Sequence, residues 1–293
     1  MKRILAKAFA LLALLLLADL GVGALCRYLE THPKGGYTAE FNYIADQMDE
    51  PVVIFGSSKA SHHYDPAILA DSLGLGVYNA GRDGNGIIFA YGQYQLIRRR
   101  HPRVIIYDLI ADFDIEQGDN TRYLNWLRRF HQRPGIDSII LSVDPTERWK
   151  MLSSMRQYNK QFIQIVYDYL RPQPVPAQGY RPLEGTASSP APDPSGPWQT
   201  DTLKLRYMRR LIADCRADGV RLIFVVSPHY WPLDRRRFAP VEHMAAANDI
   251  PFLWHADRFL TDTTLFVDAA HLNARGAAAF TRLLVPALRP HLP

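Results

Sequence analysis

The chain has 293 residues, a net charge of +5 and 47% hydrophobic residues, which is typical of a globular protein with a sizeable core. Without an N-terminal leader of about 30 residues, the length fits one large α/β domain better than two. The excess charge comes mostly from scattered arginines, such as the runs at 98–100 and 235–237, which we expect to be solvated helix faces. Aromatic residues do not alternate with these arginines, so we expect no nucleic-acid partner.

The first 30 residues predict a membrane helix. Three basic residues in the first seven positions precede an apolar run at 8–26, which only Asp19 interrupts. This run is just long enough to cross a bilayer at about 1.5 Å per residue, and the preceding charge keeps the N-terminus cytoplasmic. We therefore expect residues 1–30 to be an uncleaved single-pass anchor and the body to be extracytoplasmic, in the periplasm. The alternative is a signal peptide with its core at 8–18, cleaved at 22–24.

The two cysteines exclude a disulfide framework, because Cys26 lies in the leader and Cys215 in a later helical stretch. No Cys or His cluster has the spacing of metal ligands. We expect neither a metal nor a cofactor.

Residues 31–293 predict one domain in which strands and helices alternate. The predicted strands are at 52–55, 76–79, 103–110, 221–226 and 251–255. The predicted helices are at 27–50, 66–73, 87–100, 202–217, 233–248 and 274–288. This alternation favours a three-layer, doubly wound α/β fold with a parallel sheet of about five strands.

An insertion is predicted within this domain at 119–200. Its first part, to about residue 170, has a helical pattern, and the apolar residues at 146–170 follow a period of about 3.6. Eight prolines at 172–197 then predict loop or extended coil. Such a loop in a compact domain is either a mobile lid or an inert insertion, and we expect an inert one.

The sequence Gly56-Ser57-Ser58 directly follows the first predicted strand. Ligands of a parallel sheet gather at the carboxyl ends of its strands, so a serine on this turn can expose its hydroxyl there. A free hydroxyl is a weak nucleophile and needs a base within hydrogen-bond reach. Taken alone, the motif is equally typical of an ordinary strand-to-loop turn.

A second glycine-containing turn, Asn79-Ala80-Gly81-Arg82-Asp83-Gly84-Asn85, follows the second strand. Gly81 has no side chain to keep its N–H away from a substrate carbonyl, which is the requirement for an oxyanion donor. An ordinary glycine-rich turn explains the same residues.

The third motif, Asp268-Ala-Ala-His271, stands just before the last predicted helix, for which Asn273 is the expected N-cap. A carboxylate at this spacing can hold the imidazole Nδ1–H and leave Nε2 free to take a proton from a serine. We therefore predict that Ser58, His271 and Asp268 converge as nucleophile, base and acid.

The order of these motifs resembles the SGNH/GDSL hydrolase superfamily, whose blocks are Gly-Asp-Ser after the first strand, a glycine after the second and Asp-x-x-His before the last helix. The resemblance implies that Ser58 is the nucleophile, with Ser57 where aspartate is usual. It also implies that the Ser58 and Gly81 N–H groups form the oxyanion hole. The superfamily's third block, Gly-x-Asn, is absent after the third strand, and Asn85 is the candidate replacement.

The stretch GSSKASHHY more narrowly resembles membrane-anchored, extracytoplasmic members of this superfamily that are linked to O-acylation of envelope polysaccharides. This resemblance implies an esterase or O-acyltransferase acting on acyl esters, acetyl above all, of a cell-envelope glycan. It also implies a membrane-bound O-acyltransferase as a partner. The absent third block favours an alternative, a catalytically degenerate scaffold or glycan-binding protein with the same fold.

Four further residues are candidates for contacting the substrate: Lys59, His62, His63 and His229. For Lys59 a solvent-facing position is the simpler expectation, and for the adjacent histidines structural packing is the alternative. Two histidines in a row on extended backbone point apart, so they are poor co-ligands for one metal ion. The aromatic residues after His229, Tyr230 and Trp231, either stack on a sugar or close the end of the sheet.

Overall fold

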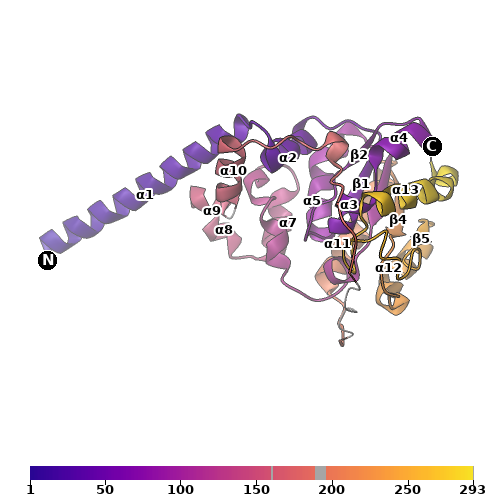
Figure 1. Ribbon diagram of the computed structural model, residues 1–293. Coiled ribbons are helices and arrows are strands. Elements are labelled where there is room, and N and C mark those ends of the chain that lie inside the picture. The colour runs from indigo at the N-terminus through magenta and orange to yellow at the C-terminus, as the bar shows by residue number, and fades with distance from the viewer. Residues whose placement is uncertain (160, 189–195, 293) are drawn as a thin grey trace. The chain divides into compact units, whose positions relative to one another are not determined.

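The computed structural model describes residues 1–159, 161–188 and 196–292 (Figure 1). Its contacts divide the chain into two compact units. The first unit consists of Met1–Tyr43 and Thr121–Val175, and the second of Ile44–Asn120 and Pro176–Pro293. The insertion predicted at 119–200 is thus shared between them, because its helical part joins the N-terminal helix and its proline-rich part joins the sheet.

The second unit is built on a five-stranded sheet in which every strand is parallel to its neighbours. Its strands are β1 (Val52–Gly56), β2 (Val77–Asn79), β3 (Val104–Asp108), β4 (Arg221–Val226) and β5 (Phe252–Trp254), in the order β2-β1-β3-β4-β5. Every residue of β1, β2 and β3 is buried, as expected for strands covered on both faces. The predicted α/β fold class with about five parallel strands is confirmed.

Helices cover both faces of this sheet (Figure 1). On one face, Val52, Ile54 and Ile106 share a core with residues of α4 (Pro66–Leu73) and α13 (Ala274–Leu288), which also contacts α3 (Ser58–His63). Alternate strand residues point to the opposite face. There α5 (Ile87–Ile97) and α11 (Thr202–Ala217) pack on each other, and α12 (Ala239–Ala246) lies beside α11 and β5.

Three helices begin and end where the sequence predicts, and each has a side-chain N-cap. The carboxylate of Asp201 caps α11 and the side-chain oxygen of Asn273 caps α13. The carboxylate of Asp65 accepts the N–H groups of Ala67 and Ile68 at the start of α4. Local chemistry at the N-terminus therefore defines these boundaries.

Replacing Asp65 with alanine is expected to destabilise the protein by about 1 kcal/mol, because two N–H groups of the first turn of α4 lose their acceptor. Urea denaturation followed by circular dichroism measures the change. Asp71→Ala on the exposed face of the same helix is the matched control and should cost nothing, since alanine favours the helix interior. Equal losses in the two variants would contradict the capping role.

The first unit contains the longest helix, α1 (Lys2–Thr31), and a set of short ones. The others are α2 (Gly36–Asp46), which continues into the second unit, α7 (Ile136–Val143), α8 (Glu147–Lys150), α9 (Ser154–Tyr158) and α10 (Gln161–Leu170). Among the described residues, α1 is the one helix long and apolar enough to cross a membrane by length and composition.

Two boundaries predicted in this unit are wrong. The helix expected at 27–50 is the end of α1 followed by a separate helix, because Pro33 disfavours helical backbone at the residue before it. The apolar period at 146–170 is divided among α8, α9 and α10. Asn159, with a φ of +40°, ends α9, and an apolar period does not reveal such a break.

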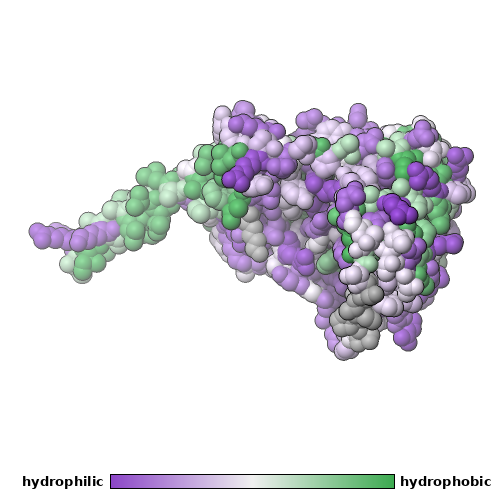
Figure 2. Space-filling model, in the orientation of Figure 1, coloured by the Kyte–Doolittle hydropathy of each residue, from purple (hydrophilic) through white to green (hydrophobic). Residues whose placement is uncertain are grey.

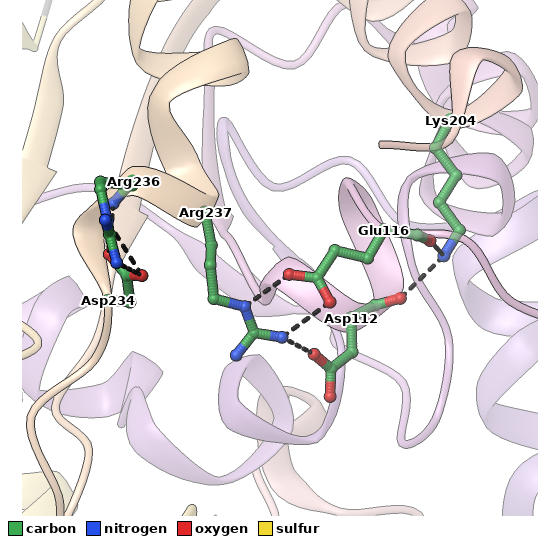
Figure 3. Close-up of polar contacts among 6 residues, drawn as sticks. All are labelled: Asp112, Glu116, Lys204, Asp234, Arg236 and Arg237. Atoms are coloured by element: carbon green, nitrogen blue, oxygen red, sulfur yellow. Dashed lines mark hydrogen bonds and ion pairs between the residues drawn. The ribbon is translucent and has the colours of Figure 1, made fainter. Parts of the chain in front are cut away.

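The expectation that the arginine runs are solvated holds for Arg99, Arg235 and Arg236, which are exposed, and is wrong for Arg98, Arg100 and Arg237. Arg237 donates to Glu116 at 2.5 Å from Nε and to Asp112 at 2.5 Å from Nη2, while the buried Lys204 donates to the backbone carbonyls of the same two residues (Figure 3). Arg98 pairs with acidic residues of α11 and the residue that follows it. These side chains hold elements of the second unit together.

Candidate active site

Gly56 positions Ser58 at the carboxyl edge of the sheet. Its φ of +143° lies where side chains are rarely tolerated, and a Cβ there would meet the carbonyl oxygen of Asp108 at 2.6 Å. The chain then turns so that Ser58 is the first residue of α3. The sequence predicted a turn here and missed this six-residue helix, which carries no apolar period. At this position Ser58 is only partly buried, whereas its neighbours Ser57 and Lys59 are buried.

His271 lies within hydrogen-bond reach of both Ser58 and Asp268, although Ser58 and His271 are 213 positions apart. The Ser58 Oγ is 2.8 Å from His271 Nε2, and His271 Nδ1 is 2.9 Å from Asp268 Oδ2. An ionised carboxylate can only accept, so Nδ1 carries the ring proton. Nε2 is then the acceptor for the Ser58 hydroxyl.

The loop that carries the imidazole is braced by its own carboxylate. Asp268 Oδ1 accepts the backbone N–H groups of Ala270 and His271, each at 2.8 Å. Partial burial works to raise the pKa of Asp268, but these bonds and the adjacent imidazole lower it to about 2. Asp268 is therefore ionised at neutral pH and keeps the His271 ring in the tautomer that can accept a proton.

A buried chain of hydrogen bonds runs behind the His271 loop. The N–H of Leu272 donates to His63 Nε2 at 3.0 Å, so His63 carries its proton on Nδ1 and donates to Ser227 Oγ at 3.0 Å. The Ser227 hydroxyl in turn donates to Asp108 Oδ2 at 3.1 Å. Burial, together with the Lys59 charge, lowers the pKa of His63 well below 6.5, which keeps this imidazole neutral.

This chain of hydrogen bonds predicts that His63 acts through His271. His63→Leu removes both bonds and should lower kcat by on the order of 10²-fold with little change in KM, because the base is displaced while binding groups stay. His63→Gln keeps one donor and one acceptor and should recover part of the loss. Kinetics on a small acyl ester, with thermal unfolding of both variants, measures this. Wild-type kcat in a folded His63→Leu protein would contradict it.

Lys59 does not face solvent as expected. Its side chain is buried, and Nζ donates to the carbonyl oxygen of Ser227 at 2.7 Å. Ser227 follows β4 and Asp108 ends β3. Polar residues at the ends of two buried strands were therefore the sequence signal for the hydrogen bonds that join them to Lys59 and His63. This signal shows where the strands end, but not which side chains pair.

His62 lies next to the His271 ring. The ring centroids are 5.6 Å apart, with the rings nearly perpendicular. His62 Nδ1 donates to the carbonyl oxygen of Arg181 at 2.6 Å, and Nε2 is 3.4 Å from Asp83 Oδ2. Burial opposes protonation, but these two acceptors outweigh it and raise the pKa of His62. The two histidines lie on a helix rather than on the extended backbone expected, and they have separate partners.

Two of the three expected oxyanion donors, Gly81 and Asn85, already donate to other groups. The N–H of Gly81 donates to Asn79 Oδ1 at 3.1 Å, and Asn85 Nδ2 donates to the carbonyl oxygen of Asp83 at 3.0 Å. Gly81 itself lies against the start of α3, where a Cβ would meet the Ser61 nitrogen at 2.5 Å. Glycine is thus required here by close packing. Within the described chain, none of the hydrogen bonds uses the N–H of Ser58.

His229 and the aromatic residues after it also lie at this edge of the sheet. His229 is buried, and its Nδ1 lies 3.0 Å from the carbonyl oxygen of Trp231. Tyr230 is buried against Phe266 and Trp231. It closes the end of the sheet, which was the alternative to sugar stacking.

The expectation that the proline-rich segment is inert is wrong for residues 179–187, which we call the strap. The strap carbonyls accept hydrogen bonds from both sides of the site: Arg181 from His62, Leu183 from the N–H of Ala274, and Gly185 from the side chain of Asn273. Ala187 donates its N–H to the carbonyl of Phe266 at 2.7 Å. The strap therefore ties α3 to the loop that carries Asp268 and His271.

The comparisons with known proteins find a likeness to solved structures. No family model and no curated protein matches the chain. Among solved structures, the chain is similar to one from Bacteroides fragilis described as "a putative acylhydrolase", with a TM-score of 0.40 and 11% sequence identity. The match covers 83% of this chain and 88% of that one.

Proposed function

We propose that this protein is a membrane-anchored serine esterase or O-acyltransferase of the SGNH type. The observation that carries the proposal is the 2.8 Å contact between the Ser58 hydroxyl and His271 Nε2, with Asp268 on the opposite ring nitrogen. Nucleophile, base and orienting acid are thereby in the arrangement that acyl transfer requires. The order of the three motifs along the sequence adds to this support.

In the proposed reaction, Ser58 Oγ attacks the carbonyl carbon of an ester while His271 Nε2 takes the hydroxyl proton. The tetrahedral intermediate collapses, and His271 returns that proton to the leaving alcohol oxygen. An acyl group is then bonded to Ser58. Water or a sugar hydroxyl attacks this acyl-enzyme, His271 again serves as base and then acid, and free Ser58 is restored. Asp268 stays ionised and stabilises the imidazolium in both halves.

The hydrogen-bond donors that would stabilise the oxyanion are the least preorganised part of the site. The Ser58 N–H at the start of α3 is the first donor, since the opening residues of a helix have no intrahelical acceptor. Gly81 becomes the second donor when its N–H exchanges Asn79 Oδ1 for the substrate oxygen. Asn85 is the third candidate.

We further propose that the substrate is an acyl ester, acetyl above all, of an extracytoplasmic cell-envelope glycan, with a membrane-bound O-acyltransferase as partner. The resemblance of GSSKASHHY to anchored members of the superfamily supports this class of substrate. Lys59, His63 and His229 are buried in internal contacts. His62, whose ring centroid lies 5.6 Å from that of His271, is the substrate contact that we propose beside the base. The α1 helix is proposed as the uncleaved anchor, because Gly23 and Cys26 pack within the first unit.

The alternative function is a non-catalytic scaffold with the same fold. Two observations favour it: the Gly81 N–H is already bonded, and the superfamily's usual asparagine donor is absent. Under this alternative the Ser58 hydroxyl would have no enhanced reactivity.

A serine-directed fluorophosphonate followed by peptide mass spectrometry tests the proposal. We expect a single adduct on Ser58, because the phosphonyl group needs both an activated hydroxyl and an oxyanion site. Heat-denatured protein is the control and should give no adduct. An adduct on a different serine, or none on folded protein, would favour the scaffold.

A further inference from the structure

The N-terminal helix α1 has a free part and a packed part. From Ile4 to Leu17 its large apolar side chains are exposed, with Leu12 at 66% and Leu17 at 67%. From Asp19 onward, one face is covered by α9 and α10. Cys26 and Leu29 are buried there with Tyr158 and Ile165. The free part is the segment that would meet lipid if α1 spans a bilayer.

Asp19, where the free part of α1 meets its packed part, binds the start of α9. Its carboxylate accepts the Ser153 hydroxyl at 2.6 Å and the backbone N–H groups of Ser154 at 2.7 Å and Met155 at 3.0 Å. Gly23, one turn further along α1, lies so close to Ser154 that a Cβ would be 2.3 Å from the serine Cβ. The start of α9 is therefore fixed at the level of Asp19 and Gly23 along the α1 axis.

That level lies within the span expected of a bilayer. The hydrocarbon core takes about 20 residues of helix at about 1.5 Å each. If the hydrocarbon core begins at Arg3 it ends near Gly23, and if it begins at Lys7 it ends near Arg27. In both registers Asp19 lies on the membrane side of the far boundary. The three donors from α9 are what a carboxylate at that depth requires, because no water is there to solvate it.

The residues next to these donors are apolar and exposed. Leu152 is 77% exposed and Met155 is 50% exposed, on either side of Ser153 and Ser154. Trp149 is 72% exposed and lies one turn before Leu152. In Figure 2 the hydrophobic surface of α1 continues onto the part of the first unit where α1 meets α9 and α10. Tryptophan is enriched at the interface between membrane and water.

We propose that Trp149, Leu152 and Met155 form a lipid-binding surface. It inserts among the acyl chains of the leaflet far from the N-terminus, beside α1. The occupant is lipid, because the surface continues the apolar face of α1 and lies at a depth set by Asp19. The inference rests on the membrane span proposed for α1 and is independent of the chemistry at Ser58. Its consequence is that the first unit sits partly in the bilayer and is not merely tethered to it by α1.

Tryptophan fluorescence of the full-length chain in vesicles tests this surface. Wild-type protein, Trp149→Phe and Trp126→Phe are reconstituted in phosphatidylcholine, with or without bromine on the acyl chains. Subtracting each variant from wild type gives the emission of the single tryptophan removed. Trp126 is the matched control, because it packs on Tyr37 and Phe41, beyond the end of α1.

We expect brominated lipid to quench the Trp149 emission and aqueous iodide to leave it unchanged, with no bromine effect on Trp126. Trp149 emission that resists bromine and is quenched by iodide would overturn the proposal, and would point to a protein partner as the occupant. Flotation of the vesicles at high pH tests the membrane span of α1 separately from the lipid-binding surface. Protein that floats with unquenched Trp149 overturns the surface alone, whereas protein that does not float overturns the span of α1 and the surface with it.

Discussion

Replacing Ser58 with alanine is expected to lower turnover of a small acyl ester by about 10⁴- to 10⁶-fold. The variant keeps His271 and Asp268 but removes the atom that forms the acyl-enzyme. Little structural change is expected, because Ser58 is only partly buried and its hydroxyl is bonded to His271 at the site itself. Initial rates of p-nitrophenyl acetate hydrolysis, with circular dichroism as a check of folding, measure the effect.

Ser57→Ala is the matched control for this experiment. The Ser57 hydroxyl is fully buried and has no hydrogen-bond partner among the described residues. Its loss should leave turnover within a few fold of wild type. If Ser57→Ala abolished turnover and Ser58→Ala did not, the nucleophile would be assigned to the wrong serine.

Replacing Asp268 with asparagine should lower kcat by about 10⁴-fold while leaving the loop folded. The asparagine oxygen can still accept the N–H groups of Ala270 and His271 that Asp268 Oδ1 accepts now. Its amide nitrogen, however, can donate to His271 Nδ1. The ring proton then moves to Nε2, which can no longer take the proton of Ser58. The expected loss is therefore in kcat and follows from the wrong tautomer.

The control is Asp262→Asn, a few residues earlier in the same loop region. Asp262 accepts the N–H and hydroxyl of Thr264 and has no contact with the His271 ring, so its substitution should leave kcat unchanged. Steady-state kinetics of both variants across pH 5 to 9 gives the comparison. Equal activity of Asp268→Asn and wild type would mean that the carboxylate does not select the tautomer.

Elements with a local chemical signal were predicted from the sequence with little error. The buried strand β4 and the capped helices α4, α11 and α13 have the predicted bounds, because their apolar runs and N-caps are local features. The short helix α3 was missed, since SKASHH contains no apolar period. The helices α8, α9 and α10 were predicted as one, because the apolar period at 146–170 continues across the break at Asn159.

In the candidate site, too, some contacts could be predicted from the sequence and others could not. That Ser58 meets Asp268 and His271 was predicted from strand ends and motif order, both readable along the chain. The hydrogen bonds from Leu272 through His63 and Ser227 to Asp108 join four segments whose pairing depends on the folded sheet. The contacts of the strap could not be predicted, because its prolines indicate coil and say nothing of which carbonyls will accept hydrogen bonds.

The wide separation of Ser58 and His271 has a consequence for a newly made chain. The imidazole precedes α13, and α13 completes the core only by docking on α3 and α4. A polypeptide that emerges N-terminus first therefore displays its serine long before the partner imidazole exists. The proposed hydrolytic activity begins only with the closing helix, so biosynthesis itself delays the onset of catalysis and no inhibitory propeptide is needed for that delay.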